Sequence, residues 1–184
     1  MFREAKATAI ASFFVDKVGT NQINDIDLMK LTVFAERICL EEHTSTMTGD
    51  KFVNMPFGPV LSRMYNCMKN GKIEPTWNEH FEPMDADYMI RRKRPYDFKS
   101  VLAEWEIELL EKIWGLHGES IKWDKVRYAH SPQVPEWKRP EPPARAETLD
   151  LTRIFNVGLK DDIETAIAKA NLIANVEGAR RKFQ

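Results

Sequence analysis

The side chains able to do chemistry are scattered along this sequence and form no recognisable motif. They are four histidines and two cysteines, namely His43, His80, His117, His130, Cys39 and Cys67. Cys39 and His43 share one face of a predicted helix, but a zinc site takes three or four protein ligands, and only Cys67 offers another thiolate. The sequence has no phosphate-binding glycine loop, nucleophile elbow, His-Glu-x-x-His or Cys-x-x-Cys pattern. We therefore predict no catalytic residue, no metal and no cofactor.

The composition is typical of a globular protein. The chain has 184 residues, of which 43% are hydrophobic and 30% charged, and its formal net charge is −1. This length suits one domain, which we expect to span residues 1–184. A charge near zero gives no overall field that attracts nucleic acid or an anionic membrane. No apolar run approaches the ~20 residues that span a bilayer, and the first residues lack a signal-peptide pattern. We expect a cytoplasmic protein whose cysteines stay reduced.

Two helices are predicted before residue 45. Apolar residues at helical spacing indicate a helix over 3–18, and Gly19 ends it because glycine accepts the left-handed conformation found after many helices. Asn24 or Asp25 can cap a second helix over 26–42. That helix is apolar around most of its circumference, which is typical of the buried centre of a fold.

The middle of the chain predicts a small sheet and more helices. Segments 51–55 and 88–92 are candidate strands, and we expect them to pair in one small antiparallel sheet. Gly58 and Pro59 indicate a helix that starts at Pro59 and runs to Gly71. Two further helices are expected, one from Ser100 to about Leu116 and one from about residue 120. The predicted fold class is α+β, predominantly helical.

The last third of the chain is less regular. The segment 131–145 is rich in proline and excludes a helix or a central strand. Trp137 suggests that part of this loop is held against the domain, and two short helices are predicted to follow from Asp150 and Asp161. Three tryptophans at helical spacing are expected in the core: Trp105, Trp114 and Trp123.

Three stretches of this sequence resemble the Panacea domain, also called the SocA-like antitoxin domain. They are a helix around Leu31–Arg37, a turn and strand at Met47–Val53, and a segment at Met55–Leu61. The residues that carry the motif are Lys30, Leu31, Phe34, Ala35, Gly49, Asp50, Gly58, Pro59 and Val60. The resemblance extends over 1–138, whereas 139–184, with the proline-rich loop and the predicted C-terminal helices, is poorly matched. Thr32 and Val33 depart from the usual pair of larger residues, which alters core packing only.

The resemblance implies an antitoxin that neutralises a cognate bacterial toxin by direct binding. Members are encoded beside unrelated toxins, often on phages and mobile elements. One branch delivers its toxin to a bacterial protease, so a proteolytic adaptor is the first alternative, and a phage-associated protein of other function is another. An enzyme with an unrecognised site and a transcriptional autoregulator complete the alternatives. The identity of the toxin, the stoichiometry and the oligomeric state are left open by the sequence.

Seven residues are candidates for contact with the partner: Asp50, Lys51, Phe57, Arg63, Arg91, Arg92 and Trp137. Asp50 and Lys51 precede the first strand candidate, and Gly58 and Pro59 follow it. A rigid loop that meets a partner and a turn with a helix cap are both consistent with this pattern. The basic run Arg91–Arg94 fits a solvated strand end or a docking patch for an acidic partner better than a nucleic-acid site, because nothing else in the chain supports nucleic acid.

Overall fold

A computed structural model describes residues 1–70, 74–84, 87–142, 144–149, 151 and 154 of the chain. Within these residues the helices are α1 (Glu4–Val18), α2 (Asp25–His43), α3 (Ser62–Asn70), α4 (Pro75–His80), the 3-10 turn η1 (Phe98–Ser100), α5 (Glu104–His117) and α6 (Lys122–Ala129). The strands are β1 (Gln22–Asn24), β2 (Phe52–Asn54), β3 (Val60–Leu61), β4 (Phe81–Met84), β5 (Met89–Arg92) and β6 (Glu147–Thr148). The predicted α+β class with a predominance of helix is confirmed.

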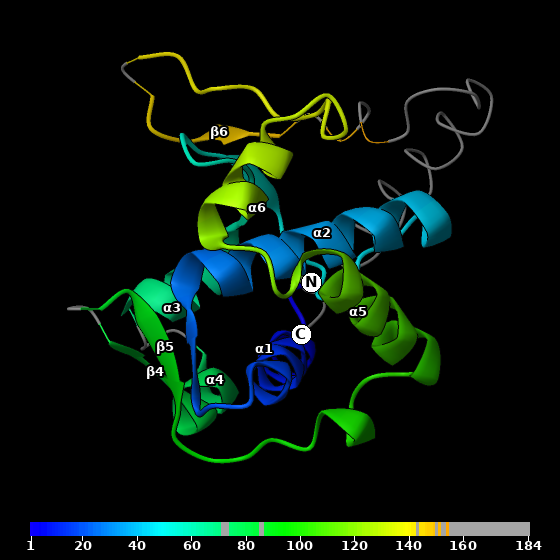
Figure 1. Ribbon diagram of the computed structural model, residues 1–184, viewed down its shortest axis with the longest axis vertical. Helices are drawn as coiled ribbons and strands as arrows, with labels where there is room; N and C mark the ends of the chain where they lie inside the picture. The colour runs from blue at the N-terminus through cyan, green and yellow to red at the C-terminus, as the bar shows by residue number, and fades with distance from the viewer. Residues whose placement is uncertain (71–73, 85–86, 143, 150, 152–153, 155–184) are drawn as a thin grey trace, which may run out of the picture.

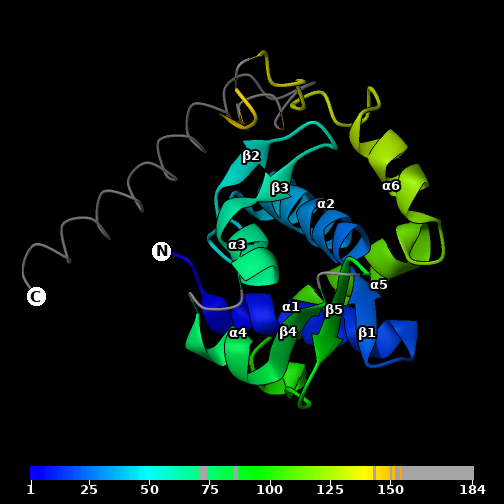
Figure 2. The same cartoon turned by 90° about the vertical axis from the view of Figure 1, so that its left-hand side faces the viewer.

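Helix α2 runs through the middle of the molecule (Figures 1 and 2). It contacts α1, α3, α5 and α6, so other elements cover it on several sides. This explains why its sequence is apolar around most of its circumference. The Asn24 side chain caps its first turn by accepting a hydrogen bond from the Ile26 amide at 3.1 Å, which confirms one of the two predicted caps.

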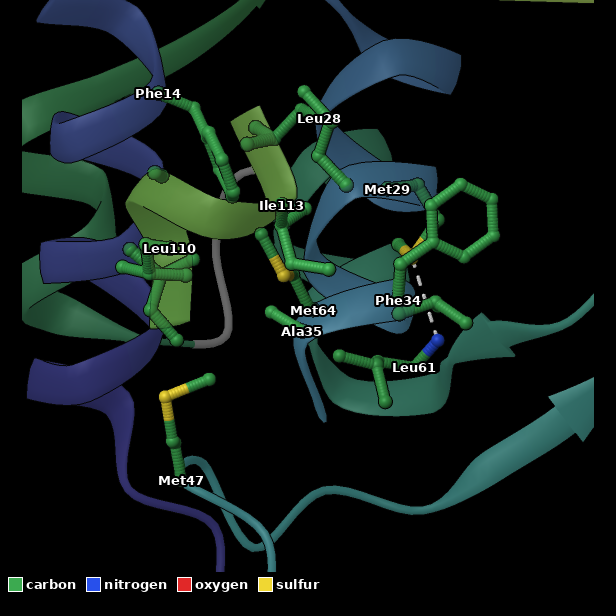
Figure 3. Close-up of a cluster of buried hydrophobic side chains, with 14 of the residues drawn as sticks. Phe14, Leu28, Met29, Phe34, Ala35, Met47, Leu61, Met64, Leu110 and Ile113 are labelled. Atoms are coloured by element: carbon green, nitrogen blue, oxygen red, sulfur yellow. Dashed lines mark hydrogen bonds between the residues drawn. The ribbon is translucent and has the colours of Figure 1, made fainter. Parts of the chain in front are cut away.

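The core forms where α1, α2, α3 and α5 meet. Figure 3 shows Phe14 of α1, Leu28 of α2, and Leu110 and Ile113 of α5 gathered between these helices, all with less than 4% of their surface exposed. Phe34 of α2 lies away from this group, with its ring centroid 5.0 Å from that of Tyr128 on α6. Burial of one such side chain stabilises the fold by roughly 1.5–3 kcal/mol. The Leu61 amide also donates to the Met29 sulfur at 3.3 Å, which ties β3 to α2.

Two separate antiparallel sheets replace the single sheet expected from the sequence. One has the order β1-β5-β4 and aligns Ile23 with Ile90; the other has the order β3-β2-β6 and aligns Phe52 with Leu61. Segments 51–55 and 88–92 therefore do not pair with each other, and the predicted pairing is wrong. Residues 52–54 pair with β3 and β6, and residues 89–92 pair with β1 and β4. Strands of two to four residues are too short for their alternation pattern to specify a pairing partner.

Three helix starts also differ from prediction. Helix α3 begins at Ser62 and not at Pro59, because residues 60–61 are used as strand β3. Helix α5 begins at Glu104 instead of Ser100, since residues 98–100 form a 3-10 turn and the Ala103 amide donates to the Glu106 carboxylate at 2.8 Å. Helix α6 begins at Lys122, two residues after Ser120. Helix α4 was missed, and Gly19 ends α1 with a φ of 75° as predicted.

Two of the three tryptophans expected in the core are at the surface. Trp105 is 41% exposed and Trp123 is 46% exposed, whereas Trp114 is half-buried and packs against the core. Helical spacing placed them correctly on helices, but it did not identify which positions another element would cover. The helices predicted from Asp150 and Asp161 lie outside the described residues. Among the described helices, none combines the length and apolar character needed to cross a membrane.

Candidate functional site

Residues 44–51, which we call the motif loop, are held by hydrogen bonds to a buried carboxylate on α2. Glu36 has no exposed surface and accepts hydrogen bonds from the amides of Met47 at 2.6 Å and Thr48 at 2.7 Å, and from the Thr48 hydroxyl. Burial raises the pKa of Glu36 to about 7, and these hydrogen bonds oppose that rise because they favour the carboxylate. Glu36 therefore fixes the path of the loop and has no oxygen left facing solvent.

Asp50 caps α3 from twelve residues away in the chain. Its carboxylate accepts hydrogen bonds from the amides of Lys51 at 2.7 Å, Arg63 at 2.9 Å and Met64 at 2.9 Å. The first amides of a helix have no partner within the helix, so a carboxylate placed there stabilises it. Burial raises the pKa of Asp50, against the effect of these amides. This carboxylate does the capping that the sequence assigned to Gly58 and Pro59.

Two motif glycines allow close approach between segments. Gly49 has a φ of +66°, and a Cβ there would lie 2.4 Å from the Met1 carbonyl oxygen. Gly58 has a φ of +96°, and a Cβ there would lie 3.0 Å from the Ala129 Cβ and 3.1 Å from the Lys30 Nζ. Any larger residue would be strained at both positions, so both glycines are explained by packing.

The motif is therefore mostly interior. Eight of its nine residues are buried, and Gly49 is intermediate; the buried ones are Lys30, Leu31, Phe34, Ala35, Asp50, Gly58, Pro59 and Val60. What these residues build is a rigid platform of α2, the motif loop and the turn before β3. The groups that reach the surface from this platform are the ones to consider for binding.

An open cleft of about 250 Å³ lies beside the platform. One wall is the first part of α2, a second is the segment Met55–Gly58, and a third comes from α3 and Tyr88. The walls are largely apolar, and three methionines contribute to them: Met29, Met55 and Met68. Methionine side chains adapt to irregular shapes, and so such a surface can fit an incoming apolar group.

Lys30 borders this cleft and is itself almost fully buried. Only 1% of its surface is exposed, and its Nζ donates to the Pro59 carbonyl at 2.8 Å. Among the described residues, no carboxylate forms an ion pair with it. Burial lowers the pKa of Lys30 to about 7, because an ammonium without a counter-charge is poorly solvated there. Lys30 is therefore an amine that titrates near neutral pH and has no carboxylate partner among the described residues.

The cleft lining contains a second polar group that is incompletely bonded. The Asp25 carboxylate pairs with Lys69 Nζ at 2.5 Å through Oδ2, while its Oδ1 is buried with no hydrogen bond among the described residues. Lys69 also lies over the rings of Tyr65, at 6.0 Å, and Tyr88, at 5.6 Å. Tyr88 has a φ of 55°, rare for a bulky residue, and is 64% exposed. Its carbonyl accepts from the Asp25 amide at 2.9 Å, which holds the turn in place.

An exposed aromatic pair lies at one edge of the cleft. Phe57, which lines the cleft, is 60% exposed, and its ring centroid is 6.2 Å from that of Trp123 on α6. We call Phe57 and Trp123 the aromatic pair. Large exposed aromatic side chains are common anchors in protein interfaces.

The proline-rich loop is fixed behind this pair, as its tryptophan suggested. Trp137 Nε1 donates to the Met55 carbonyl at 3.1 Å, and its ring stacks on His130 with the centroids 3.9 Å apart. Glu136 nearby is 3% exposed and accepts from Arg37 Nε at 2.7 Å. The Trp137 bond ties the loop to Met55, and the Glu136 pair ties it to α2.

The seven predicted contact residues fall into two groups. Asp50, Lys51, Phe57, Arg63 and Trp137 belong to or contact the platform, whereas Arg91 and Arg92 lie on β5 in the other sheet. Lys51, Phe57 and Arg63 are exposed, Trp137 is half-buried, and Asp50 is buried with three amides on its carboxylate. Arg91 pairs with Glu82 at 2.7 Å, and Arg92 pairs with Asp16. Their contact with a partner stays a prediction.

Three residues of the site were not predicted as contacts: Lys30, Trp123 and Tyr88. Lys30 was known only as a motif position, and no sequence signal shows that a lysine on a helix is buried without a counter-charge. Trp123 carried a helical pattern that suggested the core. Tyr88 belonged to the strand candidate 88–92, and the sequence did not show that it lies in the turn before the strand.

The described residues contain no group of three or more histidine, cysteine, aspartate or glutamate side chains able to hold a metal. Cys39 donates to the Ser45 carbonyl at 3.0 Å, and burial raises its pKa to about 12. Burial also raises the pKa of Cys67 to about 12. Both therefore stay thiols at neutral pH, and neither presents a thiolate.

The fold and site together define a small α+β domain with a rigid platform, an adjacent cleft and exposed aromatic side chains, features that suit a binding protein. Comparison with protein families matches residues 28–138 to the family described as antitoxin SocA-like, Panacea domain. The chain belongs to this family. Comparisons with curated proteins and with solved structures gave no match.

Proposed function

We propose that this protein neutralises a bacterial toxin by binding it directly. The observation that supports this most is the family match over residues 28–138, which spans most of the platform and of the cleft and both members of the aromatic pair. The buried motif fixes the shape of the platform before any partner arrives, and preorganisation lowers the cost of binding. A stable complex of this kind buries about 1,600 Å² in total, with a few anchors supplying most of the affinity.

The aromatic pair is the proposed anchor. Phe57 and Trp123 come from different elements, and their rings meet edge to face with the centroids 6.2 Å apart, so each limits the freedom of the other. Little side-chain entropy then remains to be lost on binding. Lys51 and Arg63, both exposed, can add polar contacts at the edge of the interface.

Co-expression with the product of the adjacent gene tests the proposal. Wild type is expected to restore growth and to co-purify with the toxin. Phe57→Ala and Trp123→Ala should each weaken the complex by roughly 30-fold, the loss expected of an interface hot spot. Trp105→Ala is the matched control, because Trp105 is also exposed but lies against His43 at the other end of α2.

Absence of both rescue and co-purification with wild type would refute direct neutralisation. Toxin half-life in cells separates inhibition from delivery to a protease. Inhibition leaves the half-life unchanged or longer, whereas an adaptor shortens it.

A further inference from the structure

A buried lysine belongs to the lining of the cleft. Lys30 forms one hydrogen bond, to Pro59, and no ion pair among the described residues, although its side chain is almost fully buried. A buried charge without a partner destabilises the folded protein. A methionine would fill a similar volume without this penalty, and three methionines already stand nearby. The position of a lysine here is explained if an anion joins it in the working complex.

The cleft also limits what can carry that anion. At about 250 Å³ it is smaller than the roughly 300–1,000 Å³ of typical small-molecule sites, and its walls are largely apolar. This space suits one or two apolar side chains. The carboxylate must therefore be attached to an apolar group, which describes a short peptide segment better than a free anion.

Two polar groups of the cleft lining differ in what they offer. The Lys30 Nζ lies against the Pro59 carbonyl and close to the place where Gly58 meets Ala129, so chain atoms enclose it. The Asp25 Oδ1 is an unused acceptor among the described residues, and the same carboxylate pairs with Lys69, which lies over Tyr88. A peptide that ends at Lys30 needs no room to continue, whereas an internal segment would have to turn back. A backbone N–H earlier in the same peptide can then donate to Asp25.

Resting on the proposed function, we propose that this cleft binds the C-terminal two or three residues of the toxin, with the terminal carboxylate on Lys30, apolar side chains between the methionines and a backbone N–H on Asp25. Capture of a chain terminus by a preformed pocket is an established mode of peptide recognition. The aromatic pair at the edge of the cleft would then contact the folded body of the toxin. The cleft would supply selectivity for the chain end.

The direct test uses the full-length protein and labelled peptides that carry the last eight residues of the adjacent gene product. The peptide with a free carboxylate is expected to bind at pH 6.5, and the same peptide with a C-terminal amide should bind at least about tenfold more weakly. Lys30→Met should reduce binding of the free-acid peptide to the level of the amide. Ile26→Trp, which adds bulk to the cleft wall, should weaken both peptides.

Lys125→Met is the matched control, because Lys125 is also 1% exposed but is paired with Asp27 at 3.1 Å and does not line the cleft. Circular dichroism confirms that each variant is folded. Should the control fail to fold, Trp105→Ala replaces it. Equal binding of the two peptides, or unchanged binding by folded Lys30→Met, overturns the proposal.

A second measurement separates this proposal from the proposed function. The toxin without its last three residues should bind the protein at least about tenfold more weakly than the intact toxin. If the shortened toxin binds as well as the intact one, the cleft proposal is wrong and direct neutralisation stands. Loss of binding only when an internal acidic residue of the toxin is changed also rejects the chain end as the occupant. If the intact toxin does not bind wild type at all, both proposals are wrong.

Discussion

The buried polar groups of the motif loop and those of the neighbouring cleft differ in how completely they are hydrogen-bonded. In the loop, the carboxylates of Glu36 and Asp50 each accept three hydrogen bonds from nearby donors. In the cleft, Lys30 has one carbonyl and no counter-charge, and Asp25 keeps one buried oxygen without a hydrogen bond among the described residues. Buried polar groups in native proteins are nearly always bonded. The bonded carboxylates build the fold, and Lys30 and Asp25 are the incompletely bonded groups that we assign to a ligand.

Two buried lysines, Lys125 and Lys30, show the same difference in bonding within one residue type. Lys125 donates to the Ser120 carbonyl at 2.5 Å and pairs with Asp27 at 3.1 Å, so it joins α6 to α2. Among the described residues, Lys30 has only the Pro59 carbonyl. We therefore assign the first lysine to stability and the second to binding.

The largest expected effect on stability is at Glu36. Replacement by alanine leaves the Met47 amide, the Thr48 amide and the Thr48 hydroxyl without their acceptor. The free energy of unfolding should fall by about 3 kcal/mol, since each buried donor left unpaired costs about 1 kcal/mol or more. Urea denaturation followed by circular dichroism measures it. Glu36→Gln, which keeps one acceptor oxygen, should lose less; equal stability of Glu36→Ala and wild type would show that the loop is held by other contacts.

Lys125→Met should have the next largest effect. The change leaves the Asp27 carboxylate without its counter-charge and the Ser120 carbonyl without its donor. A loss of about 2 kcal/mol is expected, because Asp27 keeps some access to water and is only partly dependent on the pair. Thermal unfolding measures this change. A variant as stable as wild type would remove the contrast between the two lysines.

Asp50→Ala should destabilise the protein by about 1–2 kcal/mol. The variant removes the carboxylate that caps α3 through the amides of Arg63 and Met64. Hydrogen exchange should show faster exchange for those two amides than for amides in α1. Asp50→Asn retains an acceptor and is expected to lie between the variant and wild type. Unchanged protection at Arg63 and Met64 would contradict the capping role.

The smallest effect is expected for Lys30→Met at pH 11, about 1 kcal/mol or less, from the lost bond to Pro59. Because burial lowers the pKa of Lys30 from 10.5 to about 7, the folded state disfavours the proton. The contribution of wild-type Lys30 to stability is therefore full above pH 10.5 and is lost as the pH falls toward 7. Lys30→Met should accordingly be more stable than wild type at pH 6. A variant that is less stable than wild type at pH 6 would show that Lys30 serves the fold.

Local signals in the sequence were read correctly where the physics is local. Gly19 ends α1 and Asn24 caps α2 through contacts within two or three residues. The pairing of β2 with β3, and of β5 with β1 and β4, joins strands of two to four residues, too few for a pattern of alternation to identify partners. The start of α3 was misplaced because its cap, Asp50, comes from another part of the chain. Tertiary contacts, and not local propensity, determine these strand pairings and the start of α3.

The candidate site was predictable only in part for a related reason. Phe57 and Trp137 were identified as contact candidates, and the structure places both along Met55–Gly58. Lys30 was identified as a motif residue, but its burial and the absence of a nearby carboxylate among the described residues depend on which segments cover α2. Such burial is a property of packing between distant segments, which a single sequence does not report.

The central claim is that Lys30 is retained for binding at a cost in stability. The most direct measurement is the affinity of purified Lys30→Met for the intact toxin at pH 6.5, taken together with its free energy of unfolding at the same pH. The expected result is a complex weakened at least about tenfold in a protein no less stable than wild type. Wild-type affinity in the folded variant, or weaker binding that merely follows a loss of stability, would contradict the claim.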